Sequence, residues 1–253
     1  MKQLLVLFFA TSMLFAQKQM KPEETEVWEP EPEVVQPGIL NAPPSDAIVL
    51  FDGTNFSNWQ HEGSKKPVQW ILNKDGSMTV KPGTGGIETL QEHGSVQLHL
   101  EWKSPVFVKG KGQGRGNSGI FFQRRFEVQV LDSYQNRTYS NGQASSIYKQ
   151  HIPLVNPTRP PGEWQSYDII FNEPKYNSAG EKIKSGTFTV FFNGVLVQNN
   201  VEILGTTEYI GPPRNGRDDL PGSNNPEQSR RRSLMLQDHG DLVSYRNIWM
   251  RRL

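Results

Sequence analysis

The chain has no cysteine, almost no net charge and only one long apolar run, and each of these shortages excludes a class of protein. None of its 253 residues is cysteine, so disulfides cannot stabilise the fold and a lipid cannot be attached through a cysteine. The formal net charge is +1, too small a field to argue for nucleic acid or an anionic membrane. We therefore expect no nucleic-acid partner and a fold held by its own hydrophobic core.

The apolar run stands at the N-terminus. Lys2 precedes a hydrophobic stretch that ends at a small residue, near Ala16. This is the pattern of a secretory signal peptide. A membrane anchor is the alternative, but the run is shorter than the roughly 20 residues that span a bilayer. Residues 1–16 are predicted to be a cleaved leader. A cysteine-free, exported chain is typical of the bacterial periplasm, cell envelope or extracellular space, with no membrane insertion of the mature chain.

Residues 17–46 are rich in Glu and Pro and have almost no periodic apolar pattern. Such a segment cannot bury enough surface to offset its ordering entropy, and its prolines favour an extended course. We expect a linker here, followed by one folded domain over residues 47–253, a size that all-β domains often reach.

The folded part reads as short strands separated by turn residues, without the i, i+3, i+4 spacing of amphipathic helices. Asn193-Gly194 between apolar runs is a strong hairpin signal. This pattern predicts an all-β, two-layer sandwich or jelly roll. Two long loops, residues 133–164 and 206–232, are expected to be functional or mobile. The predicted strands cover residues 47–51, 68–72, 77–80, 96–102, 125–130, 165–171, 187–197, 234–237 and 244–250.

Two of these strands alternate clearly between apolar and polar residues. In residues 125–130 the side chains of Arg125, Glu127 and Gln129 share one face, because successive strand residues point to opposite sides. In residues 96–102, His99 and Glu101 share the polar face. We expect these two polar faces to match and to form the floor of one site.

Four landmarks now occur in order, and together they resemble the 3-keto-disaccharide hydrolase family over about residues 48–253. The resemblance implies a concanavalin A-like jelly-roll sandwich of two antiparallel sheets. It also implies export and action on small carbohydrates, namely glycosides whose ring carries a ketone at carbon 3. One departure is Arg125-Phe126, where the family often has Gly-Tyr. The landmarks are Leu50-Phe51-Asp52-Gly53 with Trp59, Leu98-His99-Leu100-Glu101-Trp102, Gly116-Asn117-Ser118-Gly119-Ile120 with Glu127-Val128-Gln129-Val130-Leu131-Asp132, and Leu236-Gln237-Asp238-His239-Gly240 with Arg246-Asn247-Ile248.

A ketone at carbon 3 acidifies the proton on carbon 2, so cleavage can begin by removing that proton. This route needs a base, a stabiliser for the enediolate and an acid for the departing oxygen. Glu127 or Glu101 could be the base, if apolar surroundings raise its pKa. His239 could protonate the leaving group or polarise the ketone, because imidazole titrates near neutral pH.

The remaining candidates are expected to bind substrate. Arg246 could stabilise the enediolate, although an Arg in a closing strand often pairs with a carboxylate instead. Asn117, Ser118 and Gln129 offer the neutral donors and acceptors that sugar hydroxyls need. Arg125 and Gln237 complete the expected substrate-binding set.

No cofactor is predicted, and a divalent metal is a minority hypothesis. His99, Glu101, Glu127 and His239 together would supply nitrogen and oxygen ligands, but no short-range ligand motif is present. The sequence does not indicate the oligomeric state.

Two other functions remain open. A conventional retaining glycosidase needs carboxyl groups about 5 to 5.5 Å apart. Glu127 and Asp132 are five strand positions apart, about 16 Å along a regular strand, which disfavours that pair and assigns Asp132 to shaping the strand end and its loop. A non-catalytic lectin-like module, with Trp59, Trp70 or Trp164 gripping a sugar, is the third reading.

Overall fold

The computed structural model describes residues 20–40, 42–216 and 232–253. The predicted leader and most of the second half of the 206–232 loop lie outside these residues. The chain divides into two compact units, Met1–Val35 and Gln36–Leu253. Among its described residues, the first unit has one 3-10 helix, η1 (Pro22–Thr25), and no buried side chain.

Nearly all regular structure in the second unit is strand. No helix in the described part of the chain has the length and apolar character needed to cross a membrane. The elements, in chain order, are β1 (Ile48–Phe51), β2 (Trp59–His61), β3 (Ile71–Leu72), β4 (Met78–Thr79), β5 (Ile87–Glu92), β6 (Val96–Lys103), η2 (Gly112–Gly114), β7 (Ser118–Phe122), β8 (Phe126–Val130), η3 (Ser140–Gly142), β9 (Gln165–Asn172), β10 (Lys175–Tyr176), β11 (Lys182–Lys184), β12 (Thr187–Phe192), β13 (Val195–Glu202), β14 (Ser233–Leu236) and β15 (Ser244–Arg252).

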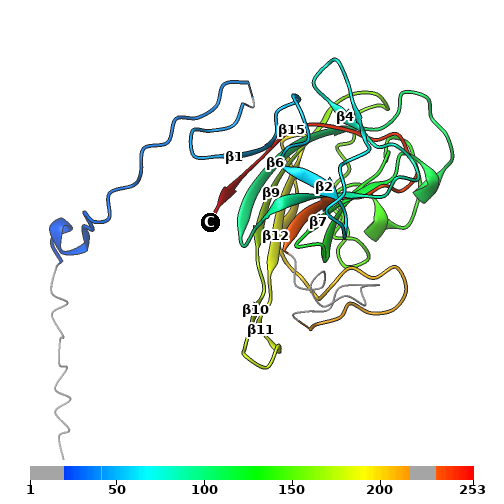
Figure 1. The fold of residues 1–253 in the computed structure, drawn as a ribbon. Helices are drawn as coiled ribbons and strands as arrows, with labels where there is room; N and C mark the ends of the chain where they lie inside the picture. The colour runs from blue at the N-terminus through cyan, green and yellow to red at the C-terminus, as the bar shows by residue number, and fades with distance from the viewer. Residues whose placement is uncertain (1–19, 41, 217–231) are drawn as a thin grey trace, which may run out of the picture. The chain divides into compact units, whose positions relative to one another are not determined.

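These strands form two main antiparallel sheets that pack face to face (Figure 1). The larger sheet has eight strands in the order β13-β12-β9-β6-β15-β4-β3, and β1 also pairs with β15. The smaller sheet has five, in the order β2-β5-β14-β7-β8. A short β10–β11 hairpin stands apart from both. The predicted all-β jelly-roll sandwich of two antiparallel sheets is confirmed.

The strands expected from alternation are present, and the predicted hairpin at Asn193-Gly194 joins β12 to β13. Both turn residues have positive φ, 51° and 79°, the conformation that an Asn-Gly hairpin turn requires. Strand β7 is different. Its residues Ser118 and Gly119 read as part of a turn, because both types are common in turns. Pairing with β8 on one side and β14 on the other overrides that local preference.

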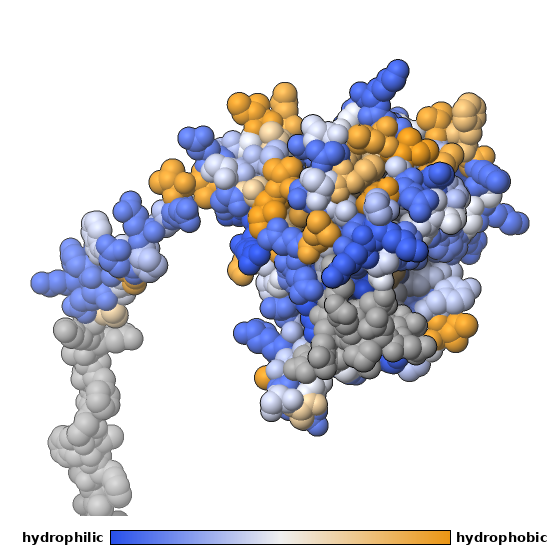
Figure 2. All heavy atoms as spheres, in the orientation of Figure 1, coloured by the Kyte–Doolittle hydropathy of each residue, from blue (hydrophilic) through white to orange (hydrophobic). Residues whose placement is uncertain are grey.

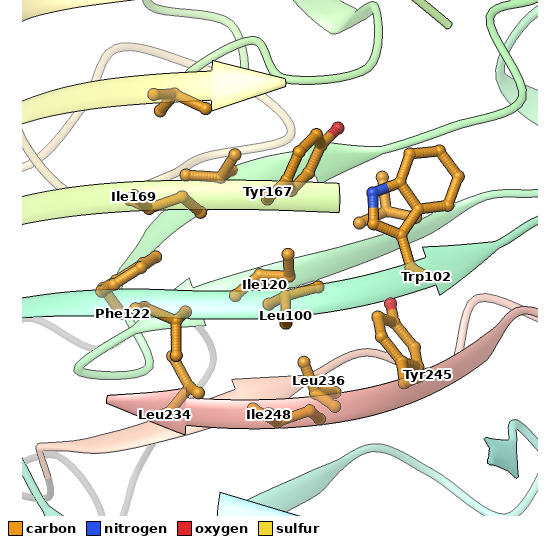
Figure 3. Packing of buried hydrophobic residues seen from close by; sticks show 14 of the residues in the cluster. Leu100, Trp102, Ile120, Phe122, Tyr167, Ile169, Leu234, Leu236, Tyr245 and Ile248 are labelled. Carbon is orange, nitrogen blue, oxygen red and sulfur yellow. The ribbon is translucent and has the colours of Figure 1, made fainter. Parts of the chain in front are cut away.

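The core lies between the two sheets (Figure 3). Leu100 and Trp102 of β6 point inward from the larger sheet, and Ile120 and Phe122 of β7 point inward from the smaller one. The Phe122 ring centroid lies 5.0 Å from that of Phe171 in β9. Aromatic pairs at such distances contribute beyond their buried area, so the sheets are joined by ring packing as well as by aliphatic contact.

Hydrophobic residues on the face shown in Figure 2 occur in small groups separated by hydrophilic ones. A separate example of an exposed hydrophobic group is the loop after β6, where Val106 and Phe107 are 68% and 90% exposed. Scattered apolar residues of this kind are ordinary on soluble domains. The exposed Phe107 can therefore serve as a control when the contribution of a buried ring to the free energy of unfolding is measured.

We expect Phe122→Ala to lower the free energy of unfolding by about 3–5 kcal/mol, because a fully buried ring is removed and a cavity remains. The control Phe107→Ala should change it by less than about 0.5 kcal/mol, since that ring is already in solvent. Urea unfolding of the two variants measures both values. Equal losses would contradict the packing described here.

Candidate active site

A cavity of about 210 Å³ lies on the outer face of the five-stranded sheet. In β8, Val128 and Val130 are fully buried in the core between the sheets, so Glu127 and Gln129 point the opposite way. Phe121 of β7 is directly across from Glu127. The cavity is lined by Asn117, Phe121, Glu127, Gln129, Tyr148, Thr207, Tyr209, Gln237 and His239.

Two loops reach this cavity because they hydrogen-bond to the free edge of β8. The backbone N–H of Glu127 donates to Thr207 Oγ1 at 2.9 Å. The carbonyl oxygen of Glu127 accepts a bond from Tyr148 N at 3.2 Å. The Glu127 backbone therefore holds Tyr148 and Thr207, one residue from each of the two long loops, beside the Glu127 carboxyl group.

Gly119 in β7 leaves the space that the Glu127 carboxyl group occupies. A Cβ atom built on Gly119 would lie 2.5 Å from Glu127 Oε1, closer than real contacts allow. The glycine is thus a requirement of the site, although its residue type reads from sequence as a turn former.

Glu127 is only 4% exposed. Burial raises its pKa from 4.5 to about 8, because an apolar environment disfavours the charged form. A carboxyl group that titrates near neutral pH can donate or accept a proton under working conditions. Burial likewise raises the pKa of the neighbouring Tyr148 hydroxyl, which keeps this group a neutral hydrogen-bond donor.

His239 lines the same cavity from the turn after β14, and its side chain is exposed. Asp238 shapes this turn: its carboxylate accepts bonds from Gly240 N at 2.9 Å and from Gly85 N at 3.0 Å. The cavity therefore combines one buried acid with one solvent-accessible imidazole.

Three amide side chains supply the neutral part of the lining. Asn117 is held by its backbone N–H, which donates to Asp241 Oδ2 at 2.8 Å. Gln237 follows β14, and its backbone N–H donates to Gly119 O at 3.0 Å. Gln129 stands next to Glu127 on β8. Amides of this kind can both donate to and accept from sugar hydroxyls.

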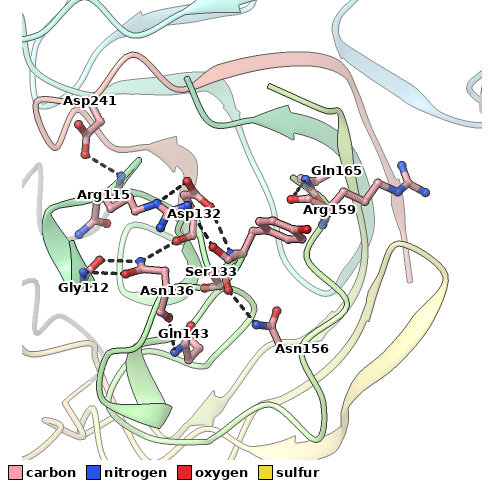
Figure 4. A network of polar contacts seen from close by, with 12 residues as sticks. Gly112, Arg115, Asp132, Ser133, Asn136, Gln143, Asn156, Arg159, Gln165 and Asp241 are labelled. Carbon is pink, nitrogen blue, oxygen red and sulfur yellow. Dashed lines mark hydrogen bonds and ion pairs between the residues drawn. The ribbon is translucent and has the colours of Figure 1, made fainter. Parts of the chain in front are cut away.

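The end of β8 is tied to its loop by a polar network (Figure 4). Asp132 is 2% exposed, and its carboxylate accepts from Arg115 Nε at 2.7 Å and from Tyr134 N at 3.2 Å. Asn136 donates to the Asp132 carbonyl at 2.7 Å and exchanges two bonds with the Gly112 backbone. The expectation that Asp132 shapes the strand end is confirmed.

Glu101 and Arg246 do not reach the cavity. Glu101 belongs to β6 and Arg246 to β15, both strands of the eight-stranded sheet. Leu100 and Trp102 of β6 face the core, so Glu101 points to the outer face of the larger sheet. The expectation of one shared polar face is therefore wrong, because the two alternating strands lie in different sheets and direct their polar faces to opposite sides of the sandwich.

On that opposite face the charged groups are paired. Arg246 Nε and Nη2 both lie 2.6 Å from Glu101 Oε2, and His99 Nδ1 lies 2.7 Å from Asp168 Oδ1. Burial lowers the pKa of His99, but the two carboxylates more than offset it and raise it to about 9. Burial raises the pKa of Glu101, while bonds from His99, Asn247 and Arg246 lower it to about 2. The Arg246 pairing left open by the sequence is the arrangement found.

Two further expected binding residues also lie elsewhere. Ser118 is on the core face of β7, where its hydroxyl donates to Gln237 O at 2.6 Å and accepts from Tyr245 at 2.7 Å. Arg125 lies in the turn before β8, is 1% exposed, and donates through Nη1 to Gln123 O at 2.7 Å. Both expectations are corrected: neither side chain lines the cavity, because residue 118 points inward and Arg125 lies outside the regular strand.

The sequence missed four lining residues, Phe121, Tyr148, Thr207 and Tyr209. Three of them belong to the two loops whose length pointed to function. Loop length alone does not say which residue lies beside β8, since that depends on hydrogen bonds to the strand edge.

The four residues considered as a metal set are not brought together. Glu127 and His239 line the cavity, whereas His99 and Glu101 lie on the opposite outer face. Within residues 20–40, 42–216 and 232–253 there is no group of three or more His, Cys, Asp or Glu side chains placed to hold a metal ion.

Three crystal structures of candidate glycosyl hydrolases from Parabacteroides distasonis are similar to this chain. The first is 44% identical, with a TM-score of 0.84, and the match covers 92% of this chain and 97% of that one. The second is 18% identical, with a TM-score of 0.54, covering 82% and 94%. The third is 22% identical, with a TM-score of 0.51, covering 82% and 99%. The last two support the fold alone.

No curated protein matches the sequence. The family described as the 3-keto-alpha-glucoside-1,2-lyase-like domain matches residues 46–251, which include every residue that lines the cavity and both sheets except Arg252 at the end of β15. The chain therefore belongs to the 3-keto-alpha-glucoside-1,2-lyase-like domain family.

Proposed function

We propose that this chain cleaves 3-keto-glycosides, including 3-keto-disaccharides, by removing the proton next to the ketone. The observation that carries the proposal is the pairing of Glu127, whose pKa is raised to about 8, with the accessible His239 in one cavity. The elimination requires one proton donor and one proton acceptor beside the substrate. Membership of the family and similarity to candidate glycosyl hydrolases support a carbohydrate substrate.

The reaction divides into two steps. In the first, a base takes the proton from carbon 2, its electron pair forms the C1–C2 double bond, and the C1–O bond breaks as the leaving oxygen receives a proton. In the second, water adds across the double bond and gives the free 3-keto-sugar. The ketone stabilises charge in the first step as an enediolate, to which the side-chain amides of Asn117 and Gln237 can donate.

The lining suits a single neutral ring. Its amides and hydroxyls match sugar hydroxyls, and its volume of about 210 Å³ is below the range of roughly 300–1,000 Å³ common for larger ligands. Tyr209, which is 73% exposed, offers an aromatic surface at the cavity for the ring or the leaving group.

A conventional glycosidase fits the cavity less well. Retaining and inverting hydrolysis both use two carboxyl groups, and Glu127 is the sole carboxylate among the described residues that line the cavity. The two mechanisms also differ in the substrates they cleave, so an experiment can distinguish them.

The purified protein should cleave a 3-keto-disaccharide and leave the unoxidised parent disaccharide intact, because only the ketone acidifies the proton on carbon 2. Chromatography of the sugars before and after incubation measures both. Cleavage of the two at equal rates would contradict the keto-specific route, and binding without cleavage of either would favour a lectin-like module.

We expect Glu127→Gln to lower kcat on the 3-keto substrate by about 100-fold to 10,000-fold, the usual contribution of one general acid or base. Glu101→Gln is the matched control: it removes a carboxylate on the opposite face, so kcat should stay within about threefold while stability falls as Arg246 loses its partner. Steady-state kinetics and thermal unfolding give the two readouts. A large loss of kcat in Glu101→Gln would contradict the site described here.

A further inference from the structure

The side-chain amide of Gln129 stands between Glu127 and two other amides, and its orientation depends on what it faces. One end of the amide lies 3.0 Å from Gln113 Oε1 and 3.3 Å from Asn117 Oδ1. The other end lies 3.0 Å from Glu127 Oε1 and 3.1 Å from Ser118 O. Only one end can carry the NH₂ group, so the neighbours decide which.

The two neighbouring amides have fixed orientations because each donates to an atom that can only accept. Gln113 Nε2 donates to Gly142 O at 2.8 Å, which leaves its Oε1 facing Gln129. Asn117 Nδ2 donates to Gln113 O at 2.7 Å, which leaves its Oδ1 facing the same way. Backbone carbonyls have no hydrogen to give, so Gln129 meets two acceptors at this end.

The Gln113 segment is itself anchored by backbone bonds (Figure 4). Gly112 N donates to Asn136 Oδ1 at 2.8 Å, and Asn136 Nδ2 donates to Gly112 O at 3.0 Å. This reciprocal pair holds the residue before Gln113, so the chain of amides begins at a rigid point.

Each end of the Gln129 amide therefore faces two oxygens, and with its NH₂ group toward Gln113 and Asn117 its Oε1 faces Glu127 Oε1 at 3.0 Å and Ser118 O at 3.1 Å. Two oxygens at this distance repel each other unless a proton lies between them. The reverse orientation would place the Gln129 oxygen against the oxygens of both Gln113 and Asn117, where no proton is available. The first orientation, with Glu127 protonated, leaves one unrelieved oxygen pair, Gln129 Oε1 with Ser118 O, whereas the reverse orientation leaves two.

We propose that the amide chain from Gln113 through Gln129 holds Glu127 in its protonated form in the free protein, and that Glu127 therefore enters the reaction as the proton donor. The first half stands on the contacts alone; the second rests on the proposed function. Glu127 then protonates the departing glycosidic oxygen as the C1–O bond breaks, and His239 takes the proton from carbon 2. Gln113 is a positioning residue, since it acts through Gln129.

Among the described residues, no Lys or Arg side chain lines the cavity. The lining contributes Tyr148, Tyr209 and His239, and Tyr139 and Tyr245 stand close enough to interact with its charge. Two cationic side chains among the described residues make other contacts: Arg125 Nη1 donates to Gln123 O, and the Lys149 ammonium lies 4.5 Å from the Tyr209 ring centroid.

Infrared difference spectra across a pH titration test the first half directly. The carbonyl band of a protonated carboxyl group should be present at pH 7 in the wild type and absent in Glu127→Gln. Gln113→Met removes the fixed acceptor, lets Gln129 turn its NH₂ group toward Glu127, and should lower the pKa of that carboxyl by about one unit or more, since a donated hydrogen bond favours the charged form. Gln150→Met, at a half-buried glutamine that links the two long loops without lining the cavity, should leave it unchanged.

An ionised Glu127 at pH 7 in the wild type, or an unchanged pKa in Gln113→Met, would overturn the proposal. These readouts need no substrate, so they stand or fall separately from the proposed activity. With substrate, the fall of kcat/KM at high pH should move to lower pH by the same interval in Gln113→Met. A purely structural role would lower the rate without moving the profile.

Stability against pH gives an independent measurement. A carboxyl group whose pKa is raised on folding binds its proton more tightly in the folded chain, so its contribution to stability decreases as pH rises from about 4.5 and levels off above about 8. The gain in melting temperature from Glu127→Gln should therefore be larger at pH 8.5 than at pH 4.5. A gain that is equal at both pH values, or larger at pH 4.5, would show that Glu127 is not held protonated.

Discussion

The edge of strand β8 is the constraint on which the site depends. An edge strand presents unpaired backbone N–H and C=O groups, and these groups must be covered if they are not to pair with other chains. Here the cover comes from two loops, which bond to the backbone of Arg125, Glu127 and Gln129. Covering the edge also brings Tyr148 and Thr207 to the Glu127 carboxyl group. The same hydrogen bonds therefore protect the strand edge and build the cavity.

The two outer faces of the sandwich handle charge in opposite ways. On the outer face of the eight-stranded sheet, Glu101 and His99 are buried but paired, and their pKa values shift to favour the charged forms. On the five-stranded sheet, Glu127 is buried beside amides and aromatic rings, and its pKa moves toward the neutral form. Paired ions of this kind have a structural role, whereas a buried carboxyl group without a cationic partner is typical of a catalytic position.

Much of the fold was accessible from the sequence, because alternation of apolar and polar residues depends on each strand alone. The polar face of Glu127 and Gln129 and the hairpin at Asn193-Gly194 are examples. Which strands share a sheet depends on long-range pairing, so Glu101 was placed with Glu127 although a whole core separates their faces. The inward Ser118 and the loop residue Tyr148 were beyond reach for the same reason: their positions follow from contacts with strands distant in sequence.

The near-complete burial of Glu127 also sets the order of events in a catalytic cycle. Glu127 is 4% exposed and has almost no direct contact with water, and in the proposed arrangement its Oε1 faces the oxygen of the Gln129 amide. In the proposed reaction, the proton that replaces the one given to the leaving group would enter from the open side of the cavity, by which the alcohol also departs. Reprotonation of Glu127 would therefore follow release of that alcohol.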